Sequence, residues 1–215
     1  MSERPAPLPG EQQKPRGASA FVVSPFARLA RSHGAGMAGD ALVAIALADS
    51  LFFSIDPNDA RWRVALYLLL TVAPFGVVAP WLGPLMDRLS GGHRFMLIGA
   101  ALARALLAVG MARYIDSLLL FPLAFSMLVM GKTHHIAKSA LVPVTVRDEA
   151  GLVKANSRLS IISSVAAGLA GIPGVILLQF GGSTWVLALA ALAFLFAAAL
   201  ATRVPSLTVA EAPMG

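Results

Sequence analysis

Long apolar runs dominate the chain between residues 35 and 202, and short polar segments separate them. These runs are continuous and lack the period-two alternation of barrel strands, so they predict helices. At a rise of ~1.5 Å per residue, each run can cross a hydrocarbon layer of ~30 Å. The expected fold class is therefore an all-α membrane protein with six transmembrane helices. In chain order, these predicted helices cover 35–55, 64–86, 95–114, 117–142, 156–179 and 184–202.

The two ends of the chain differ from this apolar region. Residues 1–33 form a basic N-terminal tail that contains many Pro, Gln and Gly residues, a composition typical of disorder. The end of this tail, 21–32, is a candidate interfacial helix. Residues 34–203 are expected to form the six-helix transmembrane domain, and 204–215 a flexible C-terminal tail.

Composition supports a membrane location over a soluble fold. Hydrophobic residues make up 57% of the chain and charged residues 13%, against ~25% charged residues in a typical soluble domain. The net charge of +6 raises the alternative of a nucleic-acid-binding protein. No soluble basic face remains once the apolar runs are set aside, so nucleic acid is not an expected partner, whereas the lipid bilayer is. The chain has no cysteine, which excludes disulfides and thiolate chemistry.

The basic residues predict the orientation in the membrane. If the N-terminus is cytoplasmic, only Arg61, Arg63 and Arg113 lie on the opposite side, while Arg104 and Lys132 fall within predicted helices. Such a bias predicts that both termini are cytoplasmic. We expect the protein to lie in the bacterial inner membrane. The twelve basic residues on the cytoplasmic side are Arg4, Lys14, Arg16, Arg28, Arg31, Arg88, Arg94, Lys138, Arg147, Lys154, Arg158 and Arg203.

Ionisable residues inside the predicted helices are functional candidates, because a charge in hydrocarbon is costly. The first predicted helix carries Asp40 and Asp49, whose nine-residue separation places them on opposite faces at ~100° per residue. We expect Asp40 to line a substrate or ion pathway. For Asp49 two roles stay open, a packing contact or an embedded ion pair with Arg104 at similar depth.

The fourth predicted helix carries a cationic stripe. Lys132, His135 and Lys138 recur every three residues and share one face. This face can hold an anionic headgroup or pair with Asp40, although Lys138 can also extend to the cytoplasmic interface. The adjacent His134 and His135 point ~100° apart and have no third ligand nearby in sequence, so no metal site is expected.

A mildly polar stripe runs along the fifth predicted helix. Asn156, Ser160 and Ser164 follow a spacing of four residues and therefore share one face. That face borders either the pathway or another helix. We include Asn156 among the candidate pathway residues.

The loop after the second predicted helix has a recognisable pattern. Gly83, then Asp87-Arg88, then a glycine pair and a terminal Arg94 resemble the signature loop of the major facilitator superfamily. The resemblance implies that these four residues form a conformational latch between two halves of a transporter. The sequence departs from the pattern at Gly92-His93-Arg94, where the family often has a basic pair.

Two further segments strengthen this resemblance. The stretch 137–143 leads into 152–157, and together with Gly39-Asp40 these segments are similar to the lysophospholipid-transporter and siderophore-exporter branch of the superfamily. The resemblance covers ~35–203 and implies an N-terminal six-helix half, built from two inverted three-helix repeats.

The resemblance implies secondary transport of a lipid-like or amphipathic small molecule by alternating access. Because one six-helix half cannot enclose a central cavity, a second half is expected as a homodimer or a separate chain. The alternative is a non-transporting scaffold or accessory subunit of a larger membrane complex. The sequence has no phosphate-binding loop with its lysine, no zinc-protease helix and no nucleophile elbow. We therefore expect neither an enzyme nor a cofactor.

Overall fold

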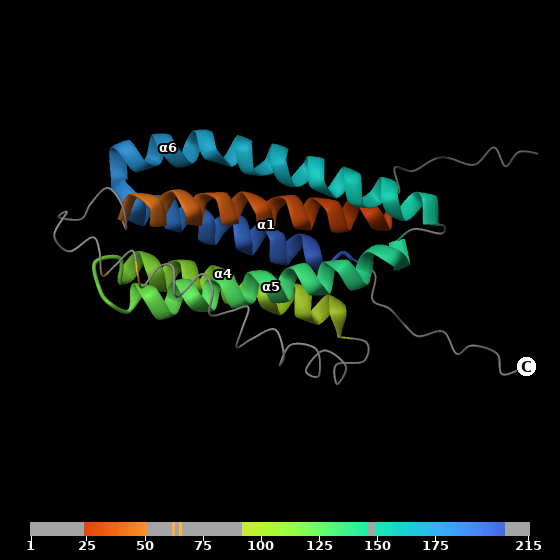
Figure 1. Ribbon diagram of the computed structural model, residues 1–215, viewed down its shortest axis with the longest axis horizontal. Helices are drawn as coiled ribbons and strands as arrows, with labels where there is room; N and C mark the ends of the chain where they lie inside the picture. The colour runs from red at the N-terminus through yellow and green to blue at the C-terminus, as the bar shows by residue number, and fades with distance from the viewer. Residues whose placement is uncertain (1–23, 51–61, 63–64, 66–91, 146–148, 205–215) are drawn as a thin grey trace, which may run out of the picture.

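The structure is a computed structural model, which describes residues 24–50, 62, 65, 92–145 and 149–204. All regular structure in these ranges is helical, as predicted for the class. Of the expected tails 1–33 and 204–215, residues 1–23 and 205–215 lie outside the described ranges, as do Gly83, Asp87 and Arg88. Four helices are described, namely α1 (Pro25–Ala48), α4 (His93–Arg113), α5 (Leu120–Thr145) and α6 (Glu149–Ala201) (Figure 1).

Helix α1 begins earlier than the apolar run suggested. The Ser24 hydroxyl accepts a hydrogen bond from the Ala27 N–H at 3.2 Å, and Pro25 occupies the first turn, where a missing N–H leaves no helical bond unmade. The helix then continues to Ala48 without a break. The expected interfacial segment and the first predicted span are therefore one helix over the described residues.

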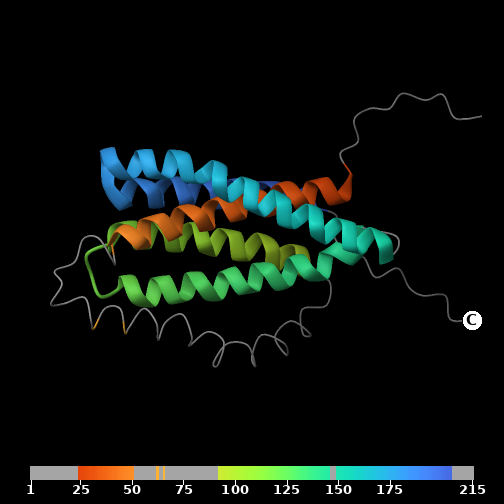
Figure 2. The same ribbon diagram turned by 45° about the horizontal axis from the view of Figure 1, so that its top comes forward.

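Helix α6 reverses direction at Gly182. This residue has φ 70° and ψ −176°, a left-handed conformation that glycine adopts without steric strain. The limbs 149–181 and 183–201 then run in opposite directions, and both views place them beside α1 (Figures 1 and 2). The Ser32 hydroxyl donates to the Ala197 carbonyl at 2.9 Å, which ties α1 to the second limb.

The prediction of six transmembrane helices is wrong. Of the four described helices, two, His93–Arg113 and Ala150–Ala201, are long and apolar enough to cross a membrane. The predicted helices 35–55 and 117–142 fall on α1 and α5, where charged and histidine side chains interrupt the apolar sequence. The predicted 156–179 and 184–202 are the limbs of one helix, and 64–86 lies outside the described residues. Two inverted three-helix repeats, and thus half of a major facilitator fold, are not formed by these four helices.

Buried apolar side chains gather in two clusters near the two ends of the bundle. One contains Leu29, Leu97 and Leu141, where α1 and α4 begin and α5 ends. The other contains Leu42 and Met111, toward the opposite ends of α1 and α4. On α1, α4 and α5, the buried polar side chains fall between the two clusters in sequence, whereas on α6 the buried Ser183 lies at the reversal. The bundle therefore has a polar layer in its interior, formed by Ser32, His33, Arg104 and His134.

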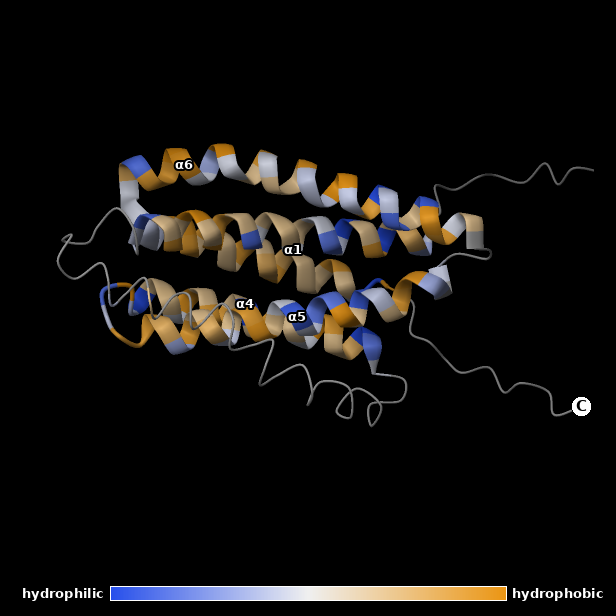
Figure 3. Cartoon of the chain, in the orientation of Figure 1, coloured by the Kyte–Doolittle hydropathy of each residue, from blue (hydrophilic) through white to orange (hydrophobic). Residues whose placement is uncertain are grey.

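The outer surface of the bundle is apolar. On α4, Phe95 and Leu106 are 73% and 74% exposed, and on α6 Leu169 and Phe180 are 65% and 86% exposed. Figure 3 shows apolar residues along the outer side of α6. Charged groups inside and large apolar side chains outside reverse the usual order of a protein folded in water. This arrangement fits a hydrocarbon surrounding.

Candidate functional site: a buried ion pair with three histidines

An ion pair links α1 to α4 in the interior. The Arg104 guanidinium Nη2 contacts Asp40 Oδ1; the Arg104 side chain is fully buried, while 37% of the Asp40 side chain is exposed. A buried guanidinium without a carboxylate partner is strongly unfavourable. The pair therefore fixes the register of α1 against α4.

An aromatic ring packs against the guanidinium of Arg104. The Arg104 Cζ atom lies 4.1 Å from the centroid of the Phe194 ring, a cation–π contact with the second limb of α6. Gly39 makes this arrangement possible, because a Cβ atom there would lie 2.6 Å from Cε1 of Phe194. The glycine before Asp40 thus allows the ring to lie against α1.

Three histidines from α1 and α5 pack beside the ion pair. The rings of His33 and His134 are nearly parallel, with centroids 6.0 Å apart, and His135 lies 5.8 Å from His33. His33 and His134 are buried, whereas His135 is exposed. Among the described residues, no group of His, Asp and Glu side chains is arranged to hold a metal ion.

A hydroxyl on α6 orients the first of these rings. Ser163 Oγ lies 2.8 Å from His33 Nε2 and donates its proton to the Leu159 carbonyl at 2.7 Å. A hydroxyl has one proton, so His33 Nε2–H is the donor in this contact. In a neutral His33 ring, Nδ1 is then the acceptor.

Several nitrogens in the interior lack a hydrogen-bond partner within the described part of the chain. In the polar layer they are Nδ1 of His33, Nε and Nη1 of Arg104, and both ring nitrogens of His134. A Cβ atom on Gly36 would lie 3.5 Å from His134 Nε2 and 3.7 Å from Arg104 Nη1. The missing side chain at Gly36 therefore leaves a space of about the size of a methyl group, which both nitrogens border.

The charge balance of this site is positive. Lys138 is half-buried on α5, and the charges of Lys138 and Arg104 both act on the His33 ring. Two cations thus accompany one carboxylate. We call the set His33, Asp40, Arg104, His134, His135 and Lys138 the polar cluster.

Comparison with known proteins gives relatives without an assigned function. The chain is 38% identical over 144 residues to the uncharacterized protein Rv0876c of Mycobacterium tuberculosis, a match that covers 64% of this chain and 26% of the relative. It is 37% identical over 139 residues to the uncharacterized protein ML2143 of Mycobacterium leprae, covering 61% of this chain and 24% of the relative. The chain thus spans about a quarter of the length of these relatives. No family model matches it, and no solved structure is similar to it.

The structure pairs Arg104 with a different aspartate from the one expected. Asp49 accepts a hydrogen bond from the Ser183 hydroxyl at 2.6 Å, near the reversal of α6. The nine residues between the two aspartates amount to ~13 Å along a helix, and Arg104 lies at the level of Asp40. The predicted Asp49–Arg104 pair is therefore replaced by the Asp40–Arg104 pair.

The other candidate residues take different positions. His135 and Lys138 lie in the polar cluster, while Lys132 is exposed on α5 with its charge acting on His135. Asn156 is exposed on the first limb of α6, outside the cluster. Arg94, expected in a latch, donates to the Thr202 carbonyl and so ties the start of α4 to the end of α6.

Sequence reasoning missed His33, Gly36 and Ser163. The first helix was expected to begin at residue 35, so His33 was left outside it. Yet His33 precedes Asp40 by seven residues, which places both on one face of a helix. A start signal at Ser24-Pro25 was present in the sequence and would have brought His33 into the site.

Proposed function

We propose that this chain is the part of a membrane transport protein that binds the anionic group of its substrate in the polar cluster. The observation that carries this proposal is the pair of unpartnered nitrogens, Arg104 Nη1 and His134 Nε2, beside the space at Gly36. Buried donors without partners are unfavourable. An oxygen atom of an anion would accept from Arg104 Nη1, and also from His134 Nε2 in the tautomer that carries its proton on that nitrogen. The excess of cations in the cluster favours the same kind of ligand.

The surroundings of the cluster support transport over a purely structural role. Ionisable residues inside an apolar bundle are costly and typically mark a substrate or ion path. The cluster lies between the two apolar cores, so a ligand there is separated from both ends of the bundle. A lipid-like or amphipathic anion fits this environment, and alternating access would carry it across.

The described cations support a cytoplasmic location for one end. Arg28 donates to the Arg203 carbonyl at 3.2 Å, so these cations lie together where α1 begins and α6 ends. Basic residues favour the cytoplasmic side of a membrane. We therefore place this end, and both termini, in the cytoplasm of a bacterial inner-membrane protein.

The test is anion binding by the full chain in detergent, with inorganic phosphate and acetate as probes and calorimetry as the readout. Gly36→Ala fills the space between the two nitrogens and should weaken binding about tenfold or more, since a hydrogen bond to a charged group contributes ~1.5–3 kcal/mol. Gly131→Ala is the matched control, because no atom lies within 4 Å of a Cβ there. Equal loss in both variants, or none in Gly36→Ala, would refute the anion site.

A scaffold or accessory subunit is the second candidate. The large apolar side chains on the outer sides of α4 and α6 favour it, because a partner chain can cover them as well as lipid can. A scaffold would assemble into its complex whether or not residue 36 carries a methyl group. Normal assembly of Gly36→Ala, together with no anion binding by the unaltered chain, would favour this role over transport.

A further inference from the structure

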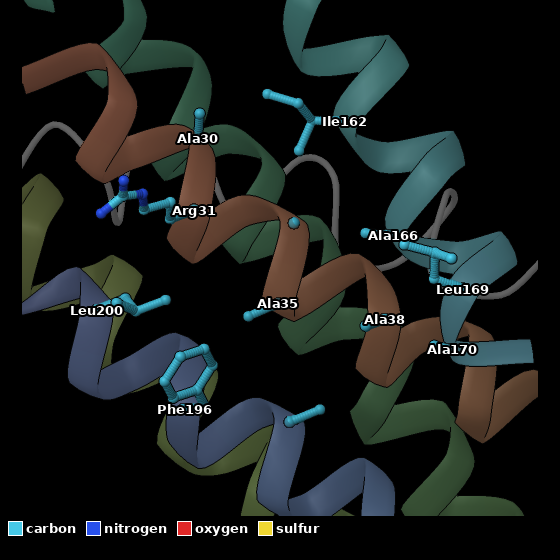
Figure 4. Close-up of a pocket in the computed structure, with 12 residues that line it drawn as sticks. Ala30, Arg31, Ala35, Ala38, Ile162, Ala166, Leu169, Ala170, Phe196 and Leu200 are labelled. Carbon is cyan, nitrogen blue, oxygen red and sulfur yellow. The ribbon is translucent and has the colours of Figure 1, made fainter. Parts of the chain in front are cut away.

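A groove of about 610 Å³ lies on the side of α1 that the two limbs of α6 flank. Figure 4 shows α1 as its floor, with Leu169 from the first limb and Phe196 from the second limb on either side. Its volume lies within the ~300–1,000 Å³ typical of sites for small molecules. The groove is open to the surroundings of the bundle and is therefore part of its outer surface.

Small residues on α1 create the groove. Ala30, Gly34 and Ala38 follow a spacing of four residues, so they share one face and leave room above the helix axis. Except for Arg31, every residue that lines the groove is Ala, Gly, Leu, Ile or Phe. Such a surface offers dispersion contacts to a flexible apolar chain and no hydrogen bond to a polar one.

A cation lies at one end of this apolar surface. Arg31 is exposed there, and Figure 4 shows its guanidinium at the end of the groove next to Leu200. Arg203 follows Leu200 by three residues, is exposed, and is joined to Arg28 through its carbonyl. The groove thus runs from the cationic end of the bundle along an apolar path.

We propose that the groove binds one acyl chain of an anionic phospholipid, with the lipid phosphate at Arg31. A cationic end followed by an apolar path matches the order of charge and hydrocarbon in such a lipid. A guanidinium fork matches phosphate oxygens in geometry as well as charge. The bilayer supplies this ligand at high local concentration, which favours a lipid over a free phosphate.

The lipid site is separate from the polar cluster. At ~100° per residue, the groove positions Gly34 and Ala38 lie on the side of α1 opposite to Gly36 and Asp40. The lipid would therefore contact the outer side of α1 while a transported anion contacts its inner side. The inference does not depend on the proposed transport function.

The test uses the full chain, purified in detergent and stripped of lipid, with phosphatidylglycerol and phosphatidylcholine of the same acyl chains as probes. Native mass spectrometry counts the lipid molecules retained. We expect phosphatidylglycerol to be retained in preference. Arg31→Gln should weaken that retention about fivefold and leave phosphatidylcholine unchanged, because one basic residue near anionic lipid contributes ~1 kcal/mol.

A second variant and a control complete the design. Ala38→Leu fills the floor of the groove and should reduce retention of both lipids. Arg113→Gln removes an exposed cation from the opposite end of α4 and should change neither. Equal retention of the two lipids, no effect of Arg31→Gln, or competition by inorganic phosphate as strong as by lipid would overturn the proposal. A lipid-free dimer that Ala38→Leu disrupts would show that a second copy occupies the groove instead.

Discussion

The replacement Asp40→Asn tests the ion pair most directly. It removes the negative charge with almost no change in shape, and it leaves the fully buried Arg104 guanidinium without its partner. Removing one partner of a buried pair typically costs ~3–5 kcal/mol of folding free energy. Because 37% of the Asp40 side chain is exposed, water weakens the interaction. We therefore expect a loss of about 2–3 kcal/mol, below the range for a fully buried pair.

The companion replacement Arg104→Met removes the cation and keeps a long apolar side chain. It loses the contact with Phe194, a cation–π interaction of ~0.5–2 kcal/mol. It leaves Asp40 able to bind water. In the Arg104→Met background, Asp40→Asn should then cost less than 1 kcal/mol, roughly the value of one neutral hydrogen bond. The two replacements are thus expected to be strongly non-additive.

The assay is reversible unfolding of the full chain in mixed micelles, applied to both single variants and the double variant. The double-mutant cycle isolates the coupling energy of the pair. Asp116→Asn, an exposed carboxylate between α4 and α5, serves as the control and should have little effect. Additivity within ~0.5 kcal/mol would show that the two side chains do not interact, and the description of the polar cluster would fail.

Three further outcomes follow from the packing. Gly39→Ala should destabilise the fold by ~1–3 kcal/mol in the same unfolding assay, because its Cβ would lie 2.6 Å from the Phe194 ring. A Cβ at Gly99 would meet no atom within 4 Å, so Gly99→Ala should stabilise the fold slightly. Equal effects of the two variants would contradict the close contact at Gly39. Ser163→Ala should cost ~1 kcal/mol through the lost histidine contact, and no change would argue that this contact is absent. Single cysteines at Ser117 and Ser157, unique labels in a cysteine-free chain, should react from opposite sides of a membrane, and reaction from one side would refute the proposed orientation.

The positions of most helices could be predicted from apolar runs alone. The prediction 95–114 matches α4 (His93–Arg113), a continuous apolar segment bounded by charge. The prediction 117–142 largely overlaps α5 (Leu120–Thr145), which begins with an apolar run. The reversal at Gly182 also falls between two predicted helices. The number of spans could not be predicted in the same way, because α1 and α5 bury ionisable side chains that hydropathy treats as unfavourable.

Predicting the ion pair required information that one sequence does not contain. Choosing between Asp40 and Asp49 as the partner of Arg104 requires the relative height of α1 and α4. That height follows from where α1 begins, and the apolar run gave a start ten residues after Pro25. The error moved the estimated depth of every side chain on that helix. A local signal, the serine and proline that start α1, would have corrected a long-range pairing.

Helix α1 carries ionisable side chains and small residues on different sides of the same segment. Its inner side carries His33 and Asp40, and Gly39 there admits the aromatic ring that supports the guanidinium. Its outer side carries Gly34 and Ala38, which open the groove between the limbs of α6. If α1 moves when the polar cluster binds an anion, the groove changes with it, and by linkage an anionic lipid in the groove would alter anion affinity by the same factor. The ratio of phosphate affinities with and without bound phosphatidylglycerol measures that coupling, and a ratio of one would show that the polar cluster and the groove are not coupled.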